Sequence, residues 1–195
     1  MRAIPIFLLA VLVPTTAFAH TGIGDGGGLA HGFAHPIGGL DHILAMVAVG
    51  VFAAVLGGRA LWMVPLAFLA MMFAGFLLGV GQIDLPFVEL GIALSSVVIG
   101  GAAALGRPMP VAAAAALVGV FATFHGHAHG AEMPADAGGA LYAAGFVTAT
   151  ALLHAVGMGA AASVARITGR FGKPLAQIAG AVFAAGGIGV LAGWL

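Results

Sequence analysis

The chain has 195 residues, of which 62% are hydrophobic and only 6% are charged, and its six acidic and six basic side chains leave no formal net charge. Because a soluble domain carries about 25% charged residues, this composition excludes a soluble globular protein and leaves a lipid bilayer as the main surroundings, while the lack of a basic patch argues against nucleic acid as a partner. No cysteine is present, so a metal site would have to use histidine nitrogen and carboxylate oxygen.

The first nineteen residues have the pattern of a secretory signal peptide. Arg2 gives a short positive region, an apolar run covers residues 4–13, and residues 17–19 fit the small-x-small rule for cleavage. The alternative is a retained first helix. Cleavage makes His20 the mature N-terminus, outside the cytoplasm. We expect residues 20–35 to form a periplasmic arm that is too rich in glycine to pack into a core.

Six apolar runs follow, each long enough to cross about 30 Å of hydrocarbon as a helix. Glycine, proline and charged residues separate them. The sequence therefore predicts an all-α, polytopic membrane helix bundle over residues 36–195, with six spans at about 36–57, 61–80, 86–105, 110–128, 139–162 and 174–194.

The basic residues indicate the orientation of these spans. If residue 20 lies outside, the inner loops hold every basic residue of the mature chain: Arg59, Arg107, Arg166, Arg170 and Lys173. This distribution follows the positive-inside rule, although a retained first helix would give the same orientation. Small residues at four-residue spacing, such as Gly75 and Gly79, indicate close helix packing. They are compatible with an oligomer but do not establish one.

Candidate metal ligands gather first at the outer end of the first span: His31, His35, Asp41 and His42. Because His35 precedes Pro36, we expect the helix to begin at Pro36. His35 and His42 share a helix face but lie roughly 10 Å apart along a straight axis. Either residues 38–39, both glycine, distort the first turn, or the two histidines serve different stations. A charged Asp41 in a membrane needs a partner or water, and could bind metal or orient a histidine from another helix.

The second cluster lies at the end of the fourth span, in the run Phe124-His125-Gly126-His127-Ala128-His129-Gly130-Ala131-Glu132. If the helix continues through this run, His125, His129 and Glu132 lie on one face and His127 faces the other way. Two histidines four residues apart are a chelating pair, to which Glu132 adds an oxygen. The alternative is a polar, solvated loop.

Other polar residues are weaker candidates. His154 lies past the middle of the fifth span, as a hydrogen-bonded core residue or as a second metal station. Glu89 begins the third span, as a pathway ligand or as a favourable charge at a helix N-terminus. For Met46, Met71 and Met72 we favour apolar packing over a role as soft ligands.

The two clusters are also where the chain resembles the HupE/UreJ family of hydrogenase and urease accessory membrane proteins. His35-x5-Asp41-His42 fits the first family motif, and residues 124–132 fit the second, FHGx[AV]HGxE, at every specified position. The signal peptide, the six spans and the histidine of the fifth span look like the family too, so the resemblance covers essentially the whole chain.

This resemblance implies a multi-pass protein of the bacterial inner membrane that takes up nickel, or cobalt in some members, for metalloenzyme assembly. It also implies the functional residues, which are His35, Asp41, His42, His125, His129 and Glu132. We add His154 and His20 as metal ligands. The metal ion, Ni2+ or else Co2+ or Zn2+, is then cargo, and no permanently bound cofactor is expected.

The sequence thus favours a divalent-metal permease that is not an enzyme. No G-x-x-x-x-G-K-[ST] motif occurs, so this chain carries no ATPase domain of that kind. An intramembrane hydrolase using Ser95, Ser96 and His154 is disfavoured, because neither G-x-S-G nor H-E-x-x-H is present. A metal-binding accessory protein or sensor without transport is the main alternative.

We further predict how the two clusters meet in space. The first, fourth and fifth spans should line one polar cavity that is open to the outside. Asp41 should point into the bundle, and its partner should be a histidine of the second cluster, His125 before His129.

Overall fold

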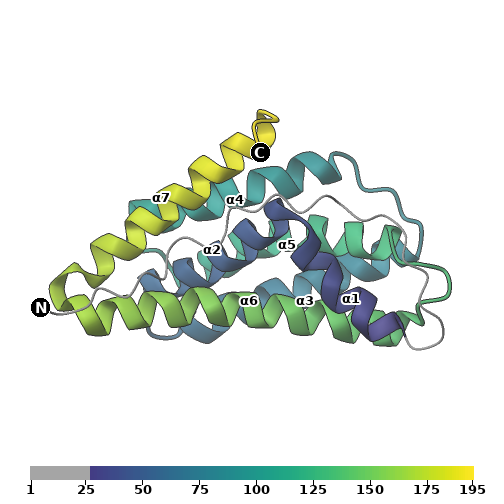
Figure 1. The fold of residues 1–195 in the computed structure, drawn as a ribbon, viewed down its shortest axis with the longest axis horizontal. Coiled ribbons are helices and arrows are strands. Elements are labelled where there is room, and N and C mark those ends of the chain that lie inside the picture. The colour runs from purple at the N-terminus through teal and green to yellow at the C-terminus, as the bar shows by residue number, and fades with distance from the viewer. Residues whose placement is uncertain (1–26) are drawn as a thin grey trace, which may run out of the picture.

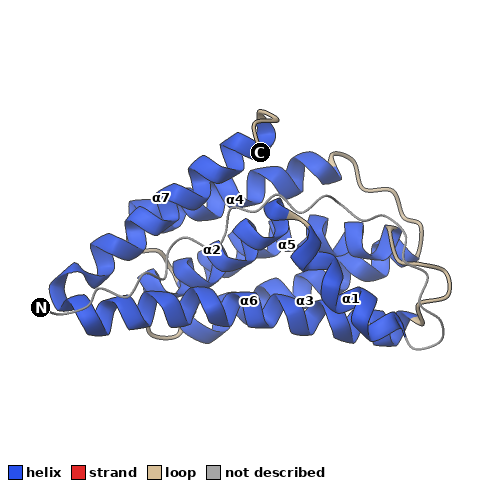
Figure 2. Ribbon diagram, viewed as in Figure 1, coloured by secondary structure: helices blue, strands red, loops and turns tan. Residues whose placement is uncertain are grey.

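The computed structural model describes residues 27–195, and these residues form helices and short connections without any strand (Figure 2). The signal peptide and His20 lie outside the described residues. In chain order the elements are α1 (Gly27–Gly38), α2 (Leu40–Leu56), α3 (Ala60–Val80), α4 (Val88–Leu105), α5 (Val111–Ala131), α6 (Gly139–Thr168), the short 3-10 helix η1 (Gly169–Phe171) and α7 (Gly172–Leu191).

Long apolar helices make this a multi-pass membrane protein. Within residues 27–195, four helical stretches are long and apolar enough to cross a bilayer: α3, α4, α5 and the run Gly139–Leu191. α1 and α2 add a fifth candidate only as a pair, bent by 84°. η1 divides the run Gly139–Leu191. From there α7 turns back at an angle to α6 and packs against α4 and α2 (Figure 1).

The predicted bounds hold best where glycine, proline or charge interrupts a long apolar run. α3, α4 and α5 begin and end within three residues of the spans predicted at 61–80, 86–105 and 110–128. α6 continues past the predicted end at residue 162, because no residue breaks the helix before Gly169, whose φ of +56° ends it.

The glycine-rich segment is a helix from Gly27 onward, so the expectation that it cannot pack is wrong for residues 27–35. α1 lies across α6 (Figure 1). A Cβ atom at Gly28 or Gly32 would overlap the backbone of Ala137 or Tyr142. The glycines therefore bring the backbone of α1 against the start of α6 and the residues just before it, as small residues do between membrane helices.

The start of the first span also differs from the prediction. Pro36 lies in the last turn of α1 instead of beginning a helix, and α2 starts only at Leu40. Gly39 between them has an extended backbone, with φ −105° and ψ 126°. The chain therefore turns sharply at Gly39. This turn brings polar residues of α1 close to those at the start of α2.

Candidate metal-binding site

Four histidine rings from three helices meet beside the turn between α1 and α2. We call His35, His42, His125 and His129 the four-histidine cluster. His42 is its centre: its ring centroid lies 4.6 Å from that of His125, 5.3 Å from His129 and 6.4 Å from His35. The rings of His35 and His129 are 4.8 Å apart. His125 and His129 are fully buried, and His42 is largely so.

The turn at Gly39 decides which of the two alternatives for His35 and His42 holds. A straight helix would place the two residues roughly 10 Å apart along its axis, whereas the bent pair brings their rings to 6.4 Å. A Cβ at Gly39 would lie 2.7 Å from Asp41 Oδ1, so a larger residue there would push on the carboxylate. The distortion at the two glycines is what lets both histidines join one cluster.

The glycines of the second motif place its histidines. α5 remains helical to Ala131, so the alternative of a solvated loop is wrong. A Cβ at Gly126 or Gly130 would overlap the backbone carbonyl of Met72 or Phe76 in α3. Each glycine directly follows one histidine, so one strip of α5 packs on α3 while the neighbouring strip presents His125 and His129. This packing role was not predicted, although the repeated His-Gly pair could have indicated it.

Asp41 is paired with its own neighbour. Its Oδ1 accepts a hydrogen bond from the backbone N–H of His42 at 2.8 Å and lies 3.2 Å from His42 Nδ1. The prediction that His125 is the partner of Asp41 is therefore wrong, and it is His42 that faces His125. A carboxylate on Nδ1 holds the proton there, which leaves the lone pair on Nε2. That atom is buried and has no hydrogen-bond partner within the described residues.

The two histidines of α5 also present unpaired nitrogens. His125 Nε2 lies 2.9 Å from Ser95 Oγ of α4, and its Nδ1 has no partner among residues 27–195. Neither ring nitrogen of His129 has one, and this ring stacks on Phe146 with centroids 4.8 Å apart. Buried polar atoms are normally hydrogen-bonded, so this concentration of unpaired imidazole nitrogens needs an explanation.

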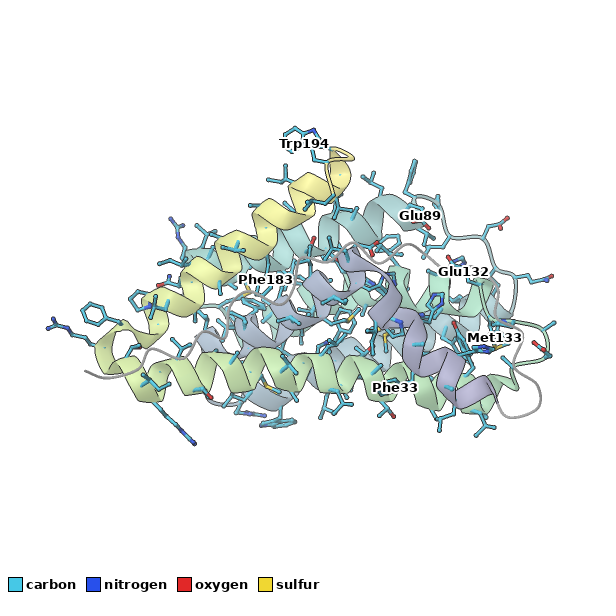
Figure 3. The ribbon with its side chains drawn as sticks, viewed as in Figure 1. Phe33, Glu89, Glu132, Met133, Phe183 and Trp194 are labelled. Carbon is cyan, nitrogen blue, oxygen red and sulfur yellow. The ribbon has the colours of Figure 1, made fainter. Side chains whose placement is uncertain are left out.

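A polar cavity of about 530 Å³ opens onto the cluster. It is lined by side chains that include His31, His35, Asp41, His42, Glu89, Glu132 and Tyr142. Glu132 Oε2 lies 3.2 Å from His35 Nε2, and Figure 3 places Glu89 and Glu132 at the same end of the bundle. Glu89 therefore shares the cavity, although it also stands in the first turn of α4.

His154 and His127 lie apart from this cluster. His154 of α6 is buried with both ring nitrogens unpaired in the described part of the chain. The Phe68 ring lies 5.1 Å from the ring of His154 and 5.8 Å from that of His125. His154 does not line the cavity, and neither does any residue of the predicted fourth span at 110–128. The predicted shared cavity is therefore confirmed for the first and fifth spans, with Glu89 of α4 and Glu132 just after α5 in place of the fourth span and His154. His127 turns away, as predicted, and its Nε2 lies 2.8 Å from the Ile83 carbonyl oxygen.

Comparison with known proteins identifies the family. The family model described as HupE / UreJ protein matches residues 8–190. The chain belongs to the HupE/UreJ family. It is similar to Protein HupE of Rhizobium leguminosarum bv. viciae, with 45% identity over 186 residues that cover 95% of each chain. No solved structure matches the chain. Both HupE/UreJ motifs of the sequence thus contribute to one four-histidine cluster.

The four-histidine cluster is not a preformed metal site in this structure. Among residues 27–195, no group of three or more His, Asp or Glu side chains is already arranged to hold a metal ion. An ion about 2.1 Å from one nitrogen of each ring keeps two ring centroids roughly 4.5–6.5 Å apart. The four measured separations, from 4.6 to 6.4 Å, lie in that range.

Proposed function

We propose that this chain is a permease that carries a divalent metal ion across the bacterial inner membrane for the maturation of hydrogenase or urease. Nickel is the proposed cargo, with cobalt and zinc as alternatives. The observation that carries the proposal is the set of buried, unpaired imidazole nitrogens below a polar cavity. Neutral imidazole is a common ligand of nickel, cobalt and zinc, and family membership supports an accessory role.

The carboxylates give the cavity its charge. Glu89, Glu132 and Asp41 line it together with His31. Acidic groups that line a cleft raise the local concentration of cations. We propose that an ion enters here, sheds water against the Glu132–His35 pair and passes to His42, His125 and His129. Asp41 acts through His42, because its carboxylate holds the Nδ1 proton.

His154 supplies a second station further along the proposed path. Its ring is reached from His125 past Phe68, and both of its nitrogens are free of partners among the described residues. Without an ATPase motif of its own, the chain would depend on a gradient. A membrane potential that is negative inside favours entry of a dication by about 4.6 kcal/mol per 100 mV.

We further propose six spans: the bent pair α1–α2, then α3, α4, α5, α6 and α7. With the mature N-terminus in the periplasm after signal cleavage, every mature basic residue then lies on the cytoplasmic side. A reporter that is active only in the cytoplasm should be silent when fused after Leu195 and active when fused after Arg107. Activity after Leu195 equal to that after Arg107 would require an odd number of spans.

The experiment that tests the proposed function is nickel uptake by the purified protein in liposomes, with cobalt and zinc as competitors. Accumulation of nickel above the level of protein-free liposomes, reduced by the competing ions, is the expected result. Binding without accumulation would instead support a sensor.

A further inference from the structure

Ser95 connects α4 to the four-histidine cluster. It is fully buried, and its Oγ donates a hydrogen bond to the Ile92 carbonyl oxygen one turn earlier in α4. The same oxygen lies 2.9 Å from His125 Nε2 of α5. α4 itself contributes no histidine to the cluster, so Ser95 is the one α4 residue with a hydrogen bond to a histidine of the cluster among residues 27–195.

The proton count at this contact fixes the tautomer of His125. A serine hydroxyl has a single proton, and here the Ile92 carbonyl receives it. The contact with His125 must then run the other way, with Nε2–H donating to Ser95 Oγ. Neutral imidazole carries one N–H, so the lone pair of His125 resides on Nδ1. That is the nitrogen that has no partner in the described structure.

His42 also has one ring nitrogen held by a neighbouring polar group, in this case a carboxylate in place of a hydroxyl. Asp41 holds the proton of His42 on Nδ1 and leaves Nε2 without a partner in the described residues. The rings of His42 and His125 stand edge to face with centroids 4.6 Å apart. Each ring therefore has one nitrogen fixed by a group behind it and one nitrogen free.

We propose that Ser95 is a positioning residue that holds His125 as the Nε2–H tautomer and so presents Nδ1 to the divalent cation. The proposal rests on the proposed function for the identity of that cation, but the tautomer itself does not depend on transport. The direction of the hydrogen bond also opposes a hydrolase, because a nucleophilic serine gives its proton to the histidine base.

Ser96 offers a matched control for the test. It is equally buried and also donates to a carbonyl of its own helix, that of Ala93, at 3.2 Å. It faces α7, where a Cβ at Gly187 would meet its hydroxyl, and it has no hydrogen bond to a histidine among the described residues. Ser95→Ala and Ser96→Ala thus remove the same atom from neighbouring sites of the helix.

The first measurement is NMR of the purified, metal-free protein carrying 15N-labelled histidine, with the His125 signal assigned by its loss in His125→Gln. The wild type and Ser96→Ala should show a protonated Nε2 and an unprotonated Nδ1. Ser95→Ala should lose this single tautomer, and Ser95→Thr, which keeps the hydroxyl, should restore it. A wild-type His125 protonated on Nδ1 would overturn the proposal, and this test stands even if Ser95→Ala does not fold.

The second measurement is the dissociation constant for nickel at equilibrium. Ser95→Ala should bind about 10- to 100-fold more weakly, the usual effect of removing a partner behind a metal-binding histidine. Ser96→Ala and Ser95→Thr should bind like the wild type. Equal affinity of Ser95→Ala and Ser96→Ala would contradict the proposal. If the wild type binds nickel with this ranking but accumulates none in liposomes, the transport proposal fails and the role of Ser95 stands.

Discussion

A His42→Ala variant should reach the membrane at the wild-type level and take up nickel more than about a hundredfold more slowly, since losing only a partner behind a metal ligand costs 10- to 100-fold. His42 is the one member of the cluster whose ring lies within 6.4 Å of all three others. Its removal takes away the central nitrogen and leaves the Asp41 carboxylate without its side-chain partner. Uptake of radioactive nickel, normalised to the protein in the membrane, measures the effect.

His127→Ala is the matched control, because it removes a histidine from the same motif whose ring faces away from the cluster. Arg59→Ala and Met71→Leu change residues outside the cavity and the cluster, and should also be nearly neutral. His129→Ala should behave like His42→Ala. Equal uptake by the His42, His129 and His127 variants would mean that the cluster histidines only pack within the bundle and take no part in transport.

Gly126→Ala should destabilise the protein as well as weaken nickel binding. The added Cβ would overlap the carbonyl oxygen of Met72, and relieving this requires α3 and α5 to separate. Overpacking costs about 1–3 kcal/mol where side chains can yield, and here the obstacle is backbone. The midpoint of thermal unfolding in detergent should therefore fall.

Gly159→Ala is the control for this substitution. Gly159 lies within α6, and a Cβ atom there would meet no other element of the described structure within 4 Å. Alanine is a better helix former than glycine by about 1 kcal/mol, so the midpoint should stay or rise. A Gly126→Ala protein as stable as Gly159→Ala, with unchanged nickel affinity, would show that close packing against α3 does not place the histidines.

Hydropathy predicted most of the helices but not how they pack. The bounds of α3, α4 and α5 followed from apolar runs ended by glycine, proline or charge, which is a local property of the chain. Glycines such as Gly28 and Gly32 are equally typical of a flexible arm. Their role in close packing becomes visible only together with the helix that they contact. The sequence allows a bend at Gly39 as one of two alternatives and does not decide between them, because the geometry of the bend depends on how α1 packs on α6.

At the candidate site, too, some features could be predicted from the sequence and others could not. His42, His125 and His129 could be named from motif and spacing, since helical periodicity places residues on a face. The pairing of Asp41 with His42 in place of His125, and the contact of Ser95 with His125, depend on rotamers and on which helices are neighbours. Neither can be obtained from a single sequence. His20 and the signal peptide stay predictions.

Accumulation of nickel inside liposomes that contain only this protein and carry an inside-negative potential tests transport by the four-histidine cluster directly. The wild type should accumulate nickel above the level of protein-free liposomes, cobalt or zinc should compete, and His42→Ala should fall to the protein-free level. Wild-type protein that binds nickel yet leaves the internal concentration at the protein-free level would contradict transport.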